Sequence, residues 1–194
     1  MIAQLTGKFL HKSPTKVIVD TNGTGYEVNI SLRTYSAISS VDSGTLFTYL
    51  KVSEDAFTLW GFAEPSEKEI FVKLIGVSGV GAATARMMLS SLKPSEIQQA
   101  IAAGNVKLLE SIKGIGKKTA ERIALELRDK LTALAPETGA AAVLHNTAEA
   151  VALEGLIALG IGKALAEQAI KKVSHSEAGS LTVEAIIKQA LKFL

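Results

Sequence analysis

The stretch SIKGIGKKTAERI, residues 111–123, places two glycines one residue apart, follows them with two lysines and continues with a helical pattern. Glycine lets the backbone turn sharply and approach another molecule closely, because it has no Cβ atom. The amide groups at the start of the following helix carry partial positive charge that suits a phosphate oxygen. Lys117 and Lys118 would add full charge at the same place. The stretch therefore predicts a tight turn that presents backbone amides to an anion.

A second copy of this pattern lies 35 positions earlier in the chain. SGVGAATA, residues 78–85, aligns with KGIGKKTA, residues 113–120. The matched pairs are Gly79 with Gly114, Gly81 with Gly116, and Thr84 with Thr119. A helix is expected on either side of each copy, and the apolar residue between the glycines, Val80 or Ile115, is expected to turn inward. The repeated unit is helix, hairpin, helix.

Other interpretations of the glycines are weaker. A dinucleotide-binding loop needs a third glycine where this chain has Thr84 or Thr119, and a Walker A loop needs Ser or Thr where Lys118 stands. Each hairpin could be only a tight turn between helices, but duplication in the basic part of the chain favours anion binding. A third similar stretch, LGIGKALAEQ from Leu159, lies in an acidic region and is interpreted as a turn of a helical bundle.

The distribution of charge points to the same region. The 194 residues have a net charge of +2, but residues 63–135 carry eleven basic against eight acidic side chains. Residues 1–62 are balanced, and residues 136–194 carry five basic against six acidic side chains. An anionic partner is therefore expected to bind the middle third.

Composition excludes several kinds of chemistry. The chain has no cysteine, so disulfides, thiolate metal sites and cysteine nucleophiles are ruled out. The three histidines show no metal-ligand spacing; they are His11, His145 and His175. We expect no metal, no other cofactor and no catalytic residue. No membrane span or signal peptide is evident, so the cytoplasm is the expected location.

Hydrophobic periodicity predicts an α+β multidomain chain. Residues 1–63 alternate like short strands, with a hairpin turn at Asn22-Gly23, and predict an OB-like β-barrel. Residues 64–134 are helical throughout and form the tandem helix-hairpin-helix domain, whose first helix is expected to begin with a capping box of Ser66 and Glu69. Residues 135–147 are small, polar and aperiodic, which predicts a flexible linker. Residues 148–194 predict a small three-helix (UBA-like) bundle.

The hairpins resemble the helix-hairpin-helix motif of structure-selective DNA-binding proteins. The whole chain resembles the RuvA family, the Holliday-junction-binding subunits of the RuvAB branch-migration complex. The resemblance rests on MIAQLTG, GTGYEV, EDAFTLWGF, GVG and LESIKGIGKKTAERI. It implies a tetramer, or two tetramers face to face, that binds a four-way junction on a basic face in DNA recombination, DNA repair and the SOS response to DNA damage.

The resemblance also implies which positions contact DNA. The matching backbone-binding positions are Gly79, Gly81, Thr84, Gly114, Gly116, Lys117, Lys118, Thr119 and Arg122. Glu54 and Asp55 match an acidic pin that projects into the centre of the junction. This chain departs from the family in carrying Ala82-Ala83 where a basic residue is common in the first hairpin, and Ser53 before the acidic pair.

The same resemblance implies partners. The C-terminal bundle would bind a RuvB-type hexameric ATPase through an apolar surface of Leu156, Leu159, Ile161 and Leu191, and a RuvC-type resolvase is a further partner. This chain, which has no motor motif, is then a non-catalytic accessory subunit of an ATP-dependent DNA helicase complex. Two alternatives are a helix-hairpin-helix repair enzyme, a glycosylase or nuclease acting on branched DNA, and a single-strand binder that uses the barrel.

Overall fold

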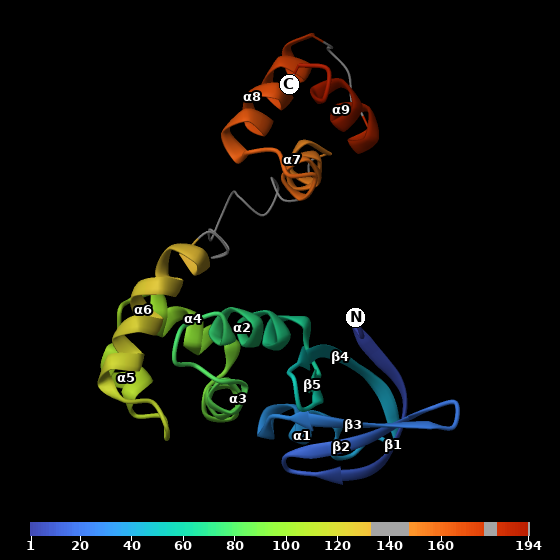
Figure 1. The fold of residues 1–194 in the computed structure, drawn as a ribbon, viewed down its shortest axis with the longest axis vertical. Coiled ribbons are helices and arrows are strands. Elements are labelled where there is room, and N and C mark those ends of the chain that lie inside the picture. The colour runs from blue at the N-terminus through green and yellow to red at the C-terminus, as the bar shows by residue number, and fades with distance from the viewer. Residues whose placement is uncertain (133–147, 177–181, 194) are drawn as a thin grey trace. The chain divides into compact units, whose positions relative to one another are not determined.

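A computed structural model describes residues 1–132, 148–176 and 182–193 (Figure 1). The chain divides into two compact units, Met1–Leu134 and Ala135–Leu194, which are described separately below. The predicted linker, residues 135–147, lies outside the described residues.

The first part of the chain forms a closed β-barrel. Its elements are β1 (Gln4–Ser13), β2 (Lys16–Thr21), β3 (Thr24–Ile30), α1 (Leu32–Ile38), β4 (Ser43–Val52) and β5 (Phe57–Phe62). The strand order around the barrel is β1-β2-β3-β5-β4, in which only β3 and β5 run parallel among the paired strands. Five strands closed in this way confirm the predicted OB-like barrel.

Local sequence explains most of the barrel. Alternate residues such as Val17 and Val19 of β2 are buried inside it, as a half-buried strand requires. The predicted hairpin turn is confirmed, because Asn22 and Gly23 have φ angles of 51° and 88°. Helix α1 was not predicted from the sequence. Ser31 caps it by accepting a hydrogen bond from the Thr34 amide at 3.0 Å.

Five helices follow the barrel. They are α2 (Pro65–Ile75), α3 (Ala82–Ser91), α4 (Pro94–Ala102), α5 (Val106–Glu110) and α6 (Lys117–Thr132). The predicted capping box of Ser66 and Glu69 is wrong, because Pro65 takes the first helical position of α2 and Glu64 the N-cap. The Glu69 carboxylate instead accepts a hydrogen bond from Lys73 at 3.0 Å, one turn along the helix.

The barrel has a core of its own, but one of its strands also contributes to the core of the helices. Trp60 and Phe62 of β5 belong to the same buried cluster as the apolar residues of α2 to α6. Phe71 of α2 lies at the junction, with ring centroids 5.4 Å from Trp60 and 4.9 Å from Phe62. The guanidinium of Arg86, on α3, lies 5.6 Å from the centre of the Trp60 ring. These contacts place the helical layer on the barrel.

A buried carboxyl group reinforces this contact. Glu67 of α2 is fully buried and accepts hydrogen bonds from the hydroxyls of Ser31 and, at 2.8 Å, Thr34, which belong to the start of α1. The Thr34 hydroxyl in turn accepts a hydrogen bond from the Ala63 amide at 3.1 Å. Burial raises the pKa of Glu67 above its ordinary value, although the two hydroxyl donors and Arg33 act in the opposite direction.

The C-terminal unit is a small helical bundle. Its described helices are α7 (Ala148–Ala158), α8 (Lys163–Ser176) and α9 (Val183–Ala190). They pack around small and branched side chains, among them Ala152, Val173 and Ile186. Thr182 begins α9 as predicted, because its hydroxyl accepts a hydrogen bond from the Ala185 amide at 3.3 Å. In residues 1–132, 148–176 and 182–193, no helix has the length and apolar character that crossing a membrane requires.

Candidate nucleic-acid interface

The two glycine hairpins have the same backbone geometry. The first hairpin is residues 77–81 and the second is residues 112–116. Gly79 and Gly114, the first glycine of each, have φ angles of 88° and 91°, a region that side-chain-bearing residues rarely adopt. Each bend is closed by a backbone hydrogen bond, Val80 N–H to the Val77 carbonyl at 3.0 Å and the equivalent bond of the second hairpin at 3.1 Å. The repeat seen in the sequence is therefore a repeat in structure.

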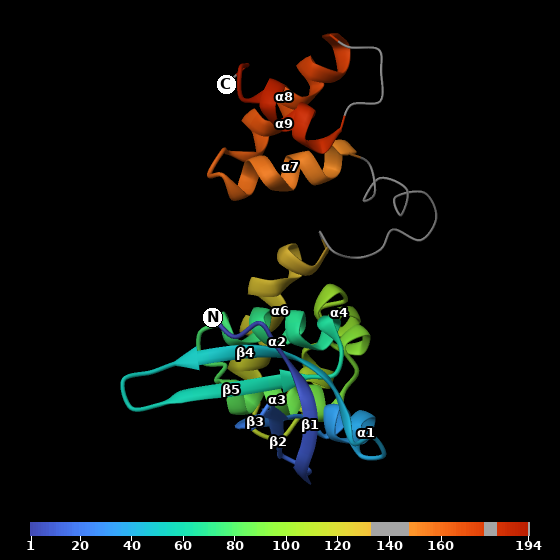
Figure 2. The ribbon, with the colours of Figure 1, turned by 90° about the vertical axis from the view of Figure 1, so that its right-hand side faces the viewer.

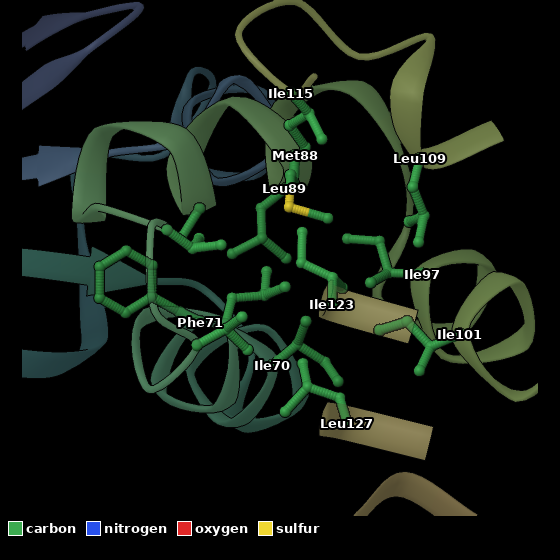
Figure 3. Close-up of a cluster of buried hydrophobic side chains, with 14 of the residues drawn as sticks. Ile70, Phe71, Met88, Leu89, Ile97, Ile101, Leu109, Ile115, Ile123 and Leu127 are labelled. Atoms are coloured by element: carbon green, nitrogen blue, oxygen red, sulfur yellow. The ribbon is translucent and has the colours of Figure 1, made fainter. Parts of the chain in front are cut away.

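An apolar residue anchors each hairpin. Val80 and Ile115, which lie between the glycines, are both buried in the helical core, as predicted. Figure 3 shows Ile115 among the residues of this core, which include Met88 of α3 and Ile123 of α6. The glycines themselves face open space, because a Cβ atom added to any of the four would meet no other atom within 4 Å. A ligand can therefore approach the backbone of both hairpins closely.

Each hairpin leads into the start of a helix. The first hydrogen bond of α3 runs from the Ala85 amide to the Gly81 carbonyl at 2.9 Å, and that of α6 runs from Ala120 to Gly116 at 2.9 Å. The amides of the three residues before Ala85, and of the three before Ala120, have no acceptor within their helix. No side chain caps α3 either. Both helix starts thus keep donors for an anion.

Side-chain charge is unequal at the two hairpins. Lys117 and Lys118 are exposed at the start of α6, whereas Ala82 and Ala83 occupy the corresponding positions of α3. The hydroxyl-bearing residues Thr84 and Thr119 are half-buried in the first turn of the same helices. The second hairpin therefore combines amides with ammonium groups, while the first has no lysine at the matching positions.

Arg122 connects the two hairpins. Its Nη1 atom donates a hydrogen bond of 3.1 Å to the carbonyl of Ser78 in the first hairpin, and its Nε atom lies 3.8 Å from the Glu126 carboxylate. A positive charge from α6 thus reaches the hairpin that has none of its own. The family resemblance pointed to Arg122 as a phosphate ligand but gave no indication of the Ser78 contact, which joins residues 44 positions apart.

The acidic pair lies at the tip of a β-hairpin. Glu54 and Asp55 are exposed in the turn between β4 and β5, which Figure 2 shows extending well beyond the rest of the barrel. The turn is closed by Ser53, whose amide and hydroxyl each donate a hydrogen bond of 3.0 Å to the Ala56 carbonyl. Two carboxylates are thereby presented to solvent.

Comparison with known proteins covers the whole chain. Family models described as "RuvA N terminal domain", "SAM-like Helix-hairpin-helix tandem" and "RuvA, C-terminal domain" match residues 1–61, 71–129 and 148–194. A protein of Flavobacterium psychrophilum is 48% identical over the full length of both chains, and one of Christiangramia forsetii is 46% identical over the same extent. The chain belongs to the RuvA family. Both relatives are named "Holliday junction branch migration complex subunit RuvA", as is a Geobacter protein that is 43% identical over 100% of this chain and 99% of its own.

Membership of the RuvA family directs attention to the C-terminal unit, where one prediction needs correction. Leu156 was expected on a partner-binding surface, but it is fully buried in the core of the bundle, where α7 meets α8 and α9. Leu159 and Leu191 are exposed, with 64% and 47% of their surface accessible, and Ile161 is half-buried against the core. The exposed leucines are thus available to a partner, and Leu156 is a packing residue.

The third glycine stretch of this RuvA chain adopts a bend like those of the two hairpins. Gly160 shares their φ angle, at 90°, but the closing bond differs: the Ile161 amide donates a hydrogen bond of 3.1 Å to the carbonyl of Leu156, five residues back, where the hairpins use the residue three back. It joins α7 to α8, so the expectation of a turn in a helical bundle agrees with the structure. The similar bend, in a bundle where Ala164 and Leu165 replace the polar positions, indicates that the glycine pattern specifies a turn and that the residues after it decide its use.

Proposed function

We propose that this chain binds four-way DNA junctions, independently of their base sequence, as the junction-binding subunit of a branch-migration complex in recombination and repair. It grips the duplex arms through phosphate contacts made by the two hairpins. The contacting residues are Gly79, Gly81, Thr84, Gly114, Gly116, Lys117, Lys118, Thr119 and Arg122. Backbone amides and ammonium groups address phosphates and carry no information about bases, so the binding follows the shape of the DNA.

One observation carries this proposal. Two glycine bends of matching geometry, with φ angles of 88° and 91°, present uncapped helix starts from a single shared core. A lone bend of this kind is an ordinary turn between helices. Two bends held by one core offer two phosphate sites at a fixed spacing, which suits neighbouring positions on a duplex backbone.

The acidic tip supports a four-way junction as the ligand in preference to a plain duplex. Glu54 and Asp55 would repel the phosphates of any strand that passes them. At the open centre of a junction they would keep the backbones apart while base pairs exchange between arms. A ligand with an open centre needs several copies of the chain around it, so we infer a tetramer, or two tetramers face to face. The cytoplasm is the compartment we assign.

The direct test is a gel-shift titration of the full chain. A synthetic four-way junction and a linear duplex of equal length are compared, each in two unrelated sequences. We expect the junction to bind at least tenfold more tightly in both sequences, and light scattering of the complex to give four or eight chains. Equal binding of junction and duplex would refute the proposal. Cleavage of either DNA in the presence of Mg²⁺ would instead favour the repair-enzyme alternative.

We further propose that the C-terminal unit binds a RuvB-type hexameric ATPase, and that the whole assembly also engages a RuvC-type resolvase. The exposed Leu159 and Leu191 support the first of these contacts. Replacing either with aspartate should abolish co-purification with the ATPase and leave junction binding unchanged. Leu156→Ala is the comparison: it should lower the melting temperature of the bundle, because it opens a cavity in the core.

A further inference from the structure

The β4–β5 hairpin carries an exposed apolar pair immediately beside its acidic tip. Val52 and Phe57 are the last paired residues of the two strands. The exposed fractions of their surfaces are 63% for Val52 and 78% for Phe57, which makes Phe57 one of the most exposed large apolar residues of the described chain. Scattered exposed apolar residues are ordinary, but two at directly paired positions of neighbouring strands form a patch that calls for a partner.

The strand register explains how this pair comes to be exposed. Leu50 and Leu59 are the next pair on the same face of the hairpin, since alternate residues of a strand point the same way. Leu59 is buried in the barrel core and Leu50 packs against it. The apolar row that fills the barrel thus continues past its end onto the projecting hairpin of Figure 2. Lys51 and Thr58, the pair between them, face the other way.

The charges around the pair limit what can cover it. Glu54 and Asp55 follow Val52 within three positions, and both are exposed carboxylates. A phosphate backbone is repelled from this tip. A nucleobase is uncharged and flat, and it can stack on a phenyl ring whatever its identity. The surroundings therefore favour a base over a backbone as the group that meets Phe57.

We propose that Phe57 stacks on an unpaired nucleobase at the crossover of the junction, with Val52 extending the apolar contact. This inference rests on the proposed function, because only a junction with an open centre offers such a base. The acidic tip then separates the phosphates while the adjacent ring holds a base that has left one duplex and not yet joined the next. The hairpin combines repulsion of backbone with attraction of bases.

Photocrosslinking of the full chain tests the contact directly. 5-Iodouracil, which crosslinks to aromatic side chains on irradiation, is placed either at the crossover of a fixed four-way junction or in the middle of one arm. We expect mass spectrometry to find the crosslink at Phe57 for the crossover position only. Crosslinks confined to other residues, or equal crosslinking from the arm, would overturn the proposal.

Substitutions provide the second test. Phe57→Ala should weaken junction binding by about tenfold and leave duplex binding unchanged, while Phe57→Trp should retain wild-type affinity. Leu10→Ala is the control, because Leu10 is likewise an exposed large apolar residue, with 63% of its surface accessible, but lies on β1, away from the tip. If Phe57→Ala alters the number of chains in the free protein, the patch is a contact between copies and the inference fails. If the wild-type chain does not prefer junctions to duplex, the proposed function itself fails.

Discussion

Arg122 of α6 donates a hydrogen bond of 3.1 Å to the backbone carbonyl of Ser78, so the helix that follows the second hairpin holds the first. The guanidinium has five N–H donors, and a single bond to a carbonyl leaves others for a phosphate. Arg122 can therefore fix the spacing of the two hairpins and bind DNA with the same side chain.

Arg122→Ala should affect both stability and binding. We expect the free energy of unfolding to fall by about 1 kcal/mol, because the Ser78 carbonyl is left without its donor. Junction affinity should also fall. Lys118→Ala is the control: it removes the same charge from the same helix without a backbone contact, so it should weaken binding and leave the urea-unfolding midpoint unchanged. Equal midpoints for the two variants would contradict the positioning role.

Reversing the charge of Lys117 and Lys118 should weaken binding to junction and duplex alike. Removing one phosphate-binding cation reduces the slope of log affinity against log salt by about one, so the slope of the double variant should be smaller by about two. The matched control is the double reversal of Lys171 and Lys172, a consecutive exposed pair in the C-terminal unit. A salt slope that stays the same in the first variant would argue against phosphate binding at α6.

The first hairpin allows backbone binding to be tested where no lysine lies at the start of the helix. Gly79 has a φ of 88°, so Gly79→Ala should cost about 1 kcal/mol of stability through backbone strain. Gly81 has a φ of −83°, which alanine adopts freely, and a methyl group there would point into open space. Gly81→Ala should therefore change stability by less than about 0.5 kcal/mol, yet weaken DNA binding by holding the phosphate away. Unchanged DNA binding in a folded Gly81→Ala protein would exclude a close backbone contact.

Replacing Glu54 and Asp55 with glutamine and asparagine should affect the rate of branch migration without lowering the affinity for the junction. The neutral tip no longer repels phosphates, so junction affinity should stay the same or rise. Branch migration driven by the partner ATPase should change in rate. A thermal melt is the control, because a solvated turn should tolerate both amides. Loss of folding would show that the pair has a structural role.

Glu67 predicts a pH dependence of stability. Its folded pKa is raised by burial, so the folded state holds a proton that the unfolded state releases near 4.5. The contribution of Glu67 to the free energy of unfolding therefore falls as the pH rises from about 4.5 through the raised pKa. Above that pKa, this contribution no longer changes with pH. Glu67→Gln removes this titration, although it disturbs the hydroxyl pair. The difference in unfolding free energy between wild type and variant should shrink over that pH range in urea titrations. A difference that does not vary with pH would contradict the assignment.

The sequence predicted the structural features that are decided by interactions between neighbouring residues. Three predicted features that depend on a few neighbouring residues are found in the structure. They are the turn at Asn22-Gly23, the burial of Val80 and Ile115, and the helix cap at Thr182. The duplicated glycines revealed the hairpins because a repeat can be found by aligning the sequence with itself.

What escaped prediction depends on contacts between distant segments. Three features depend on how the elements pack together. They are the hydrogen bond between Arg122 and Ser78, the hydroxyls of Ser31 and Thr34 around Glu67, and the burial of Leu156. The apolar residues of helix α7 are spread around its whole circumference, so its sequence does not separate a core face from a partner-binding face, and the family resemblance placed Leu156 on the wrong one. No periodicity marks such positions.

The aromatic contact of Phe71 with Trp60 and Phe62 has a mechanical consequence. Because side chains of β5 and α2 interlock in one densely packed cluster, the barrel end of the β4–β5 hairpin is held against the helical layer. The strand that leads away from the acidic turn is therefore anchored directly to the helices that carry the glycine bends.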